Sequence, residues 1–422
     1  MNKIANWYFH KNVYLKFLPF LFFYILICLV FSGKDFYGDE PRYVAFANNL
    51  LHGFYSPSYP NINLWNGPGY PIILMPFVFF KLPYLLFRLL NAFFLYFSLI
   101  ITYNTICNFS TKKAAIFFTI VLGFYYPVYY ETIYIVTEPF TWLLISLLCF
   151  LFIKCFQQKE ISWKILILTA FTIAYLAMTK VVFGYVIFIM ICISLMMFFV
   201  KAYRDWAKKA TLLFLIAFIF CLPWLFYTYS LTHKAFFWAD SGSLSLYTMS
   251  SPYENELGDW DIVGDGIPNP KRAVFMDSVS RLQPMQREAA YQDAAIQNIK
   301  AHPKKYASNW LANIGRLFFS LPFSNKVQSL TTYFTLIPNM FIVVIMVFVL
   351  GVSTVHYKKF PFAFVLLFLF LAIYLFGSSL VSAYRRMFHI TMPYWIILIA
   401  YFFSNVVEVR FIGDKKKGEG FL

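Results

Sequence analysis

Charged residues are scarce in this sequence of 422 residues: Asp, Glu, Lys and Arg together make up 13% of it. A soluble globular protein contains about 25% charged and about 45–50% apolar residues, whereas 60% of the residues are apolar here. This imbalance excludes a water-soluble protein. It is typical of a chain that exposes apolar side chains to lipid, as is the aromatic content of 22%.

Cysteine is also scarce, and none of the six cysteines lies in a long polar loop, which argues against a disulfide framework. The six histidines show no metal-ligand spacing, and the sequence contains neither a Walker phosphate loop nor a Gly-x-Ser-x-Gly nucleophile motif. No metal site is therefore predicted, although a divalent cation bound by acidic residues is left open.

The net charge of +16 would suit a nucleic-acid-binding protein, but its distribution does not. Lys and Arg occur in short clusters between apolar runs, at 112–113, 154–164, 201–209, 358–359 and 415–417. Cytoplasmic loops of membrane proteins carry positive charge in this way, whereas a nucleic-acid-binding protein concentrates it on one face or stripe. The predicted partner is a lipid bilayer and not nucleic acid.

Apolar runs close to the roughly 20 residues needed to cross a bilayer recur along the chain. They predict an all-α integral membrane protein with about ten transmembrane helices, at 14–32, 82–107, 114–130, 139–156, 165–179, 181–200, 210–230, 331–352, 361–377 and 392–409. An even number of spans puts both termini on one side, and every short basic loop falls on that side. Both termini are therefore predicted to be cytoplasmic, in a multi-pass protein of the cell (inner) membrane.

Two predicted outer segments, 33–81 and 231–330, are too long to be turns between spans. Their apolar residues recur at helical spacing, which predicts helices on the membrane surface. One of these begins at Gly38-Asp39-Glu40-Pro41 and ends at Gly53. Three parts are predicted: an N-terminal transmembrane catalytic module (1–230), an outer part with helices (231–330), and three C-terminal spans with a short basic cytoplasmic tail (331–422).

Acidic residues at the predicted outer ends of the spans are candidates for chemistry. Asp39 and Glu40 directly follow the first span, and Glu138 precedes the fourth. Asp39 also suits the N-cap of the helix that follows, and Glu40 its first turn, which would be structural roles. A capping carboxylate is rigidly held, so the structural role is compatible with that of a general base.

Basic residues stand at the same predicted ends. Lys180 is the only charge in the turn between the fifth and sixth spans, where a Lys side chain often reaches the lipid headgroups. Arg385 and Arg386 lie in the last outer loop, against the tendency of positive charge to stay inside, which favours a bound anion. Because carboxylates suit an acceptor hydroxyl and cations suit a phosphate, these residues indicate group transfer from a phosphate-linked lipid at the outer surface.

Several short motifs occur in order at the ends of the predicted spans. They are Asp39-Glu40 with Arg42-Tyr43, the segment Trp65 to Pro71, Thr137-Glu138-Pro139, Thr179-Lys180, and Tyr384-Arg385-Arg386 followed by Pro393. Together they resemble the membrane glycosyltransferases of the GT-C fold, family 39, which include protein O-mannosyltransferases and the enzymes that add aminoarabinose to lipid A. The resemblance covers most of the chain. Some relatives carry a Lys where Asn66 or Gly67 stands here, which puts part of the phosphate contact in doubt.

The resemblance implies a donor in which a sugar is linked to polyprenyl phosphate, used on the outer face with inversion at the anomeric carbon. It implies that Asp39 is the general base, with Glu40 beside it as an alternative, and that Glu138 is a second acid. Lys180 and one or both of Arg385 and Arg386 would bind the donor phosphate.

Further substrate contacts are expected from the residues around these motifs: Arg42, Tyr43, Asn66 and Tyr384. No cofactor is expected to be required. The sugar is left open, and so is the acceptor, which is a lipid, a glycan or a protein.

A transporter or flippase for a lipid-linked sugar is the alternative function. Transporters place ionisable residues or broken helices near the middle of the bilayer, whereas the spans predicted here are nearly free of charge at their centres. The candidate residues gather at one face instead, which favours catalysis at the membrane surface. A non-catalytic scaffold would leave the paired acids and the outer Arg residues unexplained.

Overall fold

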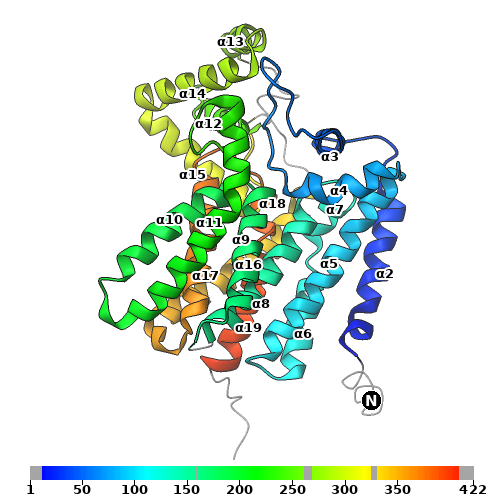
Figure 1. The fold of residues 1–422 in the computed structure, drawn as a ribbon, viewed down its shortest axis with the longest axis vertical. Helices are drawn as coiled ribbons and strands as arrows, with labels where there is room; N and C mark the ends of the chain where they lie inside the picture. Colours follow the sequence, from blue (N-terminus) through cyan, green and yellow to red (C-terminus); the bar gives the residue numbers. More distant parts are fainter. Residues whose placement is uncertain (1–11, 158–159, 261–268, 325–329, 408–422) are drawn as a thin grey trace, which may run out of the picture.

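The computed structural model describes residues 12–157, 160–260, 269–324 and 330–407. In these ranges all regular structure is helical, without strands. Figure 1 shows a bundle of long helices with a layer of shorter helices at one end. The predicted all-α class is confirmed.

Helices of the bundle match the ten predicted spans in position. They are α2 (Val13–Phe31), α5 (Tyr84–Cys107), α6 (Lys112–Gly123), α8 (Glu138–Gln157), α9 (Trp163–Thr179), α10 (Val182–Met197), α11 (Arg204–Thr232), α16 (Leu330–Val355), α17 (Phe362–Ser379) and α19 (Met392–Asn405). The third predicted span also takes in η1 (Tyr126–Val128) and α7 (Tyr129–Thr132).

Six helical segments of the described chain are long and apolar enough to cross a membrane: α2, α5, α8, α16, α17, and α11 together with the turn before it. The pair formed by α6 and η1–α7 also qualifies but is bent by 42°. Helices α9, α10 and α19 are apolar but have only 17, 16 and 14 residues. At 1.5 Å per residue, 14 residues span about 21 Å, less than the roughly 30 Å hydrocarbon core. The protein is a helical membrane protein with six candidate spans, and ten spans stay a prediction.

Burial separates the inner helices of the bundle from the lipid-facing ones. Of the residues in the most apolar stretch of each helix, 78% are buried in α8 and only 22% in α16. Large apolar side chains of α16 are exposed along its length, at Phe334, Phe341, Val344 and Val347. A continuous apolar surface of this kind requires a lipid environment.

A cap of shorter helices covers one end of the bundle (Figure 1). It consists of α3 (Glu40–Leu51), α4 (Gly69–Phe79), α12 (Ser241–Met249), α13 (Pro270–Ser280), α14 (Pro284–Ala301) and α15 (Pro303–Phe319). Helix α3 is the surface helix predicted after Gly38. Tyr247, Val279, Tyr291 and Ala295 form a small apolar core among α12, α13 and α14.

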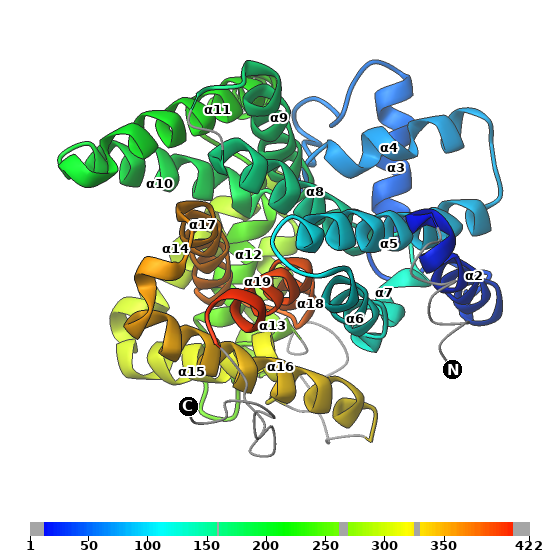
Figure 2. The same cartoon turned by 90° about the horizontal axis from the view of Figure 1, so that it is seen from below.

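The end of the bundle opposite the cap carries the basic connections. Helix α2 begins and α19 ends there (Figures 1 and 2), as do the turns that join α5 to α6 and α10 to α11. The clusters 112–113 and 201–209 lie at these connections and in the first turns of α6 and α11, while the predicted cluster 415–417 lies outside the described residues. These basic clusters therefore lie at the end of the bundle opposite the cap. That the cytoplasm lies at this end stays a prediction.

Candidate functional site

Asp39 makes ion pairs rather than a helix cap. It occupies the N-cap position of α3, but its side chain makes no capping hydrogen bond. Its Oδ1 lies 3.2 Å from Nη1 of Arg42, one turn further along α3, and its Oδ2 lies 3.2 Å from Nη2 of Arg386. The predicted role of the Asp39 side chain as a cap is therefore wrong. Two guanidinium groups hold its carboxylate instead.

Five side chains of alternating charge form a continuous row where the cap meets the bundle. Arg386 Nε lies 3.6 Å from Oε1 of Glu138, and Lys180 Nζ donates to the same oxygen at 2.7 Å. With the two pairs of Asp39, this gives the order Arg42, Asp39, Arg386, Glu138 and Lys180, here called the charged row. Its members come from α3, α18 (Arg386–His389), α8 and the end of α9. Asp39 and Arg386 are 347 positions apart in the sequence.

The members of the charged row differ in their exposure to solvent. The side chain of Glu138 is only 1% exposed, whereas those of Lys180, Asp39 and Arg386 are 20%, 23% and 33% exposed. A ligand can therefore reach the carboxylate of Asp39 and the cations. Glu138 holds two of these cations from the buried side.

Two glycines, one in the loop before α4 and one at the first position of α4, lie against the end of α9. A Cβ on Gly67 would lie 2.1 Å from the carbonyl oxygen of Met178, and one on Gly69 would lie 2.4 Å from Oγ1 of Thr179. Only glycine permits so close an approach of two backbones. The contact fixes the last turn of α9, and Lys180 follows directly. The Lys180 side chain therefore contacts Glu138 within the charged row. It does not extend to the lipid headgroups, as the structural alternative predicted.

Neutral polar side chains surround the charged row on the side of α3. Asn66 Oδ1 accepts a hydrogen bond from Arg42 Nη1 at 3.4 Å, and its Nδ2 donates to the hydroxyl of Tyr43 at 3.3 Å. The Trp65 ring lies against the guanidinium of Arg42, 4.8 Å from it. Burial, together with the carboxylates of the row, raises the pKa of Tyr43 well above its ordinary value. Tyr43 therefore stays a neutral hydroxyl.

Arg386 is held in its charged form. Burial alone would lower the pKa of its guanidinium, but the carboxylates of Glu138 and Asp39 outweigh burial and raise that pKa above its ordinary value. The guanidinium also lies 5.2 Å from the centre of the Tyr384 ring, which adds a cation–π contact. Tyr384 is therefore linked to the charged row through Arg386.

Glu40 faces away from the charged row, although it adjoins Asp39. Its fully buried carboxylate pairs with Arg88 of α5, with Oε1 2.9 Å from Nε and Oε2 3.0 Å from Nη2. It also accepts the backbone N–H groups of Tyr37 and Ile135, at 2.6 and 2.7 Å. These four hydrogen bonds join α3 to α5 and to the segment before α8. The structure thus places Glu40 as a positioning residue, outside the candidate site.

Arg385 also faces away from the charged row. Its Nη1 lies 3.1 Å from Oγ1 of Thr335 and 3.5 Å from Oγ of Ser320. Its guanidinium lies 5.4 Å from the centre of the Tyr130 ring. Of the two adjacent arginines, only Arg386 contacts the acids of the row.

Two residues that organise the site were not predicted as site residues from the sequence. Arg88 is the buried partner of Glu40, and Trp65 supports Arg42. A lone Arg within the apolar run 82–107 was a usable signal, because a charged residue inside a span requires a partner. Trp65 carried no such signal, because aromatic residues are abundant throughout the chain.

A metal site is not evident in the described ranges, where no group of three or more His, Cys, Asp or Glu side chains is suited to hold an ion. The guanidinium of Arg386 lies between the carboxylates of Asp39 and Glu138. The binding of a divalent cation is left open, and the expectation that no cofactor is required stays a prediction.

Comparison with known proteins found neither a protein-family model nor a curated protein sequence that matches this chain. The fold and the site define its class: a helical membrane protein that carries an accessible row of alternating charge between its bundle and its cap. Membership in the family 39 glycosyltransferases stays an expectation drawn from short motifs.

Proposed function

We propose that this protein is a membrane glycosyltransferase that moves a sugar from a polyprenyl-phosphate-sugar donor to a hydroxyl or phosphate of an envelope acceptor. The reaction takes place on the outer face of the cell membrane and inverts the anomeric carbon. One observation carries the proposal, the charged row between bundle and cap. It combines a proton acceptor with cations suited to a phosphate.

The donor phosphate binds to Lys180 and Arg386. Both cations contact Oε1 of Glu138, at 2.7 and 3.6 Å, so one buried carboxylate lies between them. Glu138 offsets their mutual repulsion and fixes their positions before the donor arrives. A phosphate then accepts charge-assisted hydrogen bonds from both, while the polyprenyl chain extends into the lipid.

Asp39 acts as the general base. Each of its oxygens is paired with one guanidinium and keeps a further lone pair for an acceptor hydroxyl. The acceptor oxygen forms a bond to the anomeric carbon, and the bond from that carbon to the phosphate oxygen breaks. The acceptor proton passes to Asp39, and polyprenyl phosphate leaves with its charge stabilised by Lys180 and Arg386.

Transfer in liposomes tests this function. The purified full-length protein is supplied with polyprenyl phosphate carrying a labelled sugar and with extracted envelope glycolipids and glycans. We expect label in the acceptor fraction and release of polyprenyl phosphate. Movement of the intact labelled lipid between leaflets without transfer would identify a flippase and overturn the proposal.

A further inference from the structure

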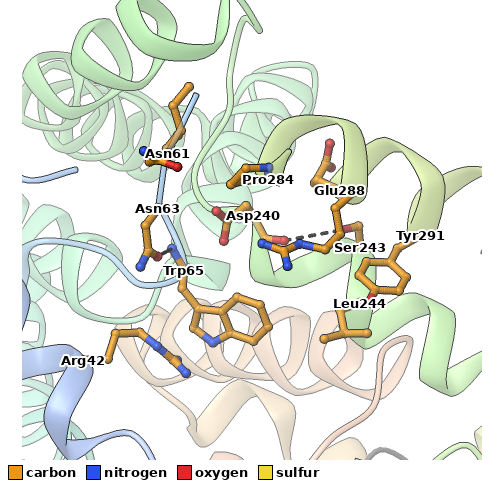
Figure 3. Close-up of a pocket in the computed structure, with 12 residues that line it drawn as sticks. Arg42, Asn61, Asn63, Trp65, Asp240, Ser243, Leu244, Pro284, Glu288 and Tyr291 are labelled. Carbon is orange, nitrogen blue, oxygen red and sulfur yellow. Dashed lines mark hydrogen bonds between the residues drawn. The ribbon is translucent and has the colours of Figure 1, made fainter. Parts of the chain in front are cut away.

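A cavity of about 390 Å³ lies between the segment 61–65 and the cap helices α12 and α14. Its volume falls in the range of about 300–1,000 Å³ typical of small-molecule sites. Figure 3 shows Trp65 and Asp240 facing this space, with Arg42 on the side of α3 and Tyr291 on the side of α14. Arg42 belongs both to the cavity wall and to the charged row, so the cavity adjoins the proposed general base.

Arg287 brings a guanidinium into the cavity wall, close enough to Asp240 for its charge to act on that carboxylate. Among the described residues its guanidinium has no hydrogen-bond or ion-pair partner, although it lines the cavity. Two further charged groups of the wall are engaged in ion pairs: Arg42 pairs with Asp39 at 3.2 Å, and Glu288 pairs with Lys234. An anionic group on a ligand would supply the direct hydrogen-bonded partner that Arg287 lacks among the described residues.

Asp240 offers an oxygen for a ligand hydroxyl. Its Oδ2 accepts the backbone N–H of Leu64 at 3.0 Å, whereas its buried Oδ1 has no partner in the described part of the chain. Burial raises the pKa of Asp240 to about 6, which reflects the poor solvation of this carboxylate. A buried acceptor without a partner is costly, so a hydroxyl donor from a ligand would stabilise it.

Trp65 provides a flat apolar surface in the same cavity, which Leu244 also lines. The C–H face of a sugar ring packs against such a surface, because both lose contact with water. The hydroxyl groups at the ring edge then reach the polar groups of the wall. An aromatic surface, an unsatisfied carboxylate oxygen and an unpaired guanidinium together suit a sugar that carries negative charge.

We propose that this cavity binds the acceptor and that the acceptor is a saccharide with an anionic substituent. The ring lies on Trp65, a hydroxyl donates to Asp240, and the anionic group binds Arg287. A neighbouring hydroxyl reaches Asp39 past Arg42. The role as acceptor site rests on the proposed function, whereas the saccharide chemistry rests on the cavity itself.

Saturation-transfer NMR on the full chain in detergent micelles tests the chemistry with three probes: glucose 6-phosphate, glucose and O-phosphoserine. We expect glucose 6-phosphate to bind roughly ten- to a hundredfold more tightly than glucose, because only the phosphate makes the charge-assisted contact. O-Phosphoserine has the anion without the ring and should bind more weakly than glucose 6-phosphate. Equal binding of these two anions would overturn the saccharide assignment and favour a peptide.

Variants of the cavity wall sharpen the test. Arg287→Ala should abolish the preference for the phosphorylated sugar, Arg287→Lys should keep part of it, and Trp65→Ala should weaken both sugars. Arg281→Ala is the matched control and should change nothing, because Arg281 is exposed and pairs with Asp277 outside the cavity. A preference that survives Arg287→Ala would overturn the inference.

The failure of this inference and the failure of the proposed function give different results, because sugar binding is measured without transfer. Transfer in liposomes combined with no binding of either sugar would overturn the cavity assignment, but the proposed glycosyltransferase function would be unaffected. Sugar binding that depends on Arg287, combined with no transfer, would overturn the glycosyltransferase and its acceptor, and the saccharide chemistry of the cavity would stand.

Discussion

Asp39 is the residue on which the proposed chemistry depends most directly. Asp39→Asn removes the proton acceptor but keeps the size of the side chain, so turnover in the liposome assay should fall roughly 10²–10⁴-fold. Helix α3 should stay intact, because the Asp39 side chain makes no capping hydrogen bond. Circular dichroism and the melting temperature in detergent check this second expectation.

The matched control for Asp39 is Asp35→Asn, an exposed acid in the same loop whose replacement should leave turnover unchanged. If Asp39→Asn transferred sugar at the normal rate, Asp39 would have no part in the mechanism. If both variants lost activity equally, the effect would belong to the charge of the loop and not to a general base.

At the scale of elements, the ion pair of Glu40 and Arg88 joins α3 to α5. Glu40→Gln leaves a buried guanidinium without its counter-ion, which should lower the free energy of unfolding by about 3–5 kcal/mol. The measurement is the thermal or denaturant-induced unfolding of the purified protein in detergent. Activity should fall with stability, because α3 also positions Asp39.

A double variant separates the ion pair from other causes. Glu40→Leu combined with Arg88→Met removes both charges and should recover part of the lost stability, since apolar pairs often replace buried ion pairs at little cost. A double variant no more stable than Glu40→Gln would show that the unpaired charge is not the reason for the loss.

The contact between the start of α4 and helix α9 gives a second prediction at this scale. In Gly69→Ala the new Cβ would lie 2.4 Å from Oγ1 of Thr179, so the start of α4 must move away from α9. We expect a loss of about 1–3 kcal/mol from overpacking and weaker donor use, because Lys180 follows Thr179. Donor KM and the melting temperature are the measurements.

The control for this contact is Gly351→Ala in α16, where the added Cβ meets no atom within 4 Å. Alanine is a better helix former than glycine, so this variant should be neutral or more stable by up to about 1 kcal/mol. A Gly69→Ala variant that behaves like Gly351→Ala would mean that the start of α4 adapts without moving the site.

At the scale of the whole molecule, the basic connections lie at the end of the bundle opposite the cap, which predicts that the cap faces outward. In a background without the native cysteines, Ser58→Cys and Ser278→Cys, both exposed on the cap side, should react with an impermeant thiol reagent added to intact cells. Lys208→Cys, exposed near the start of α11, should react only after permeabilisation. The opposite pattern would place the charged row in the cytoplasm.

The sequence by itself determined the class of the protein. Scarce charge and recurring apolar runs depend only on local composition, so they identified a helical membrane protein and the positions of its long helices. Composition marks helix ends less sharply, because apolar residues can continue past the last turn of a helix. The run 181–200, for example, contains a helix of only 16 residues, Val182–Met197.

Only the tertiary structure decided which residue of each adjacent pair belongs to the site. Neighbouring residues on a helix point about 100° apart, so Asp39 and Glu40 enter different surroundings, as do Arg385 and Arg386. The packing of distant elements selects between them, because Asp39 meets Arg386 across 347 positions of the chain. Sequence patterns report local periodicity, whereas the charged row and the cavity arise from contacts between segments far apart in the sequence.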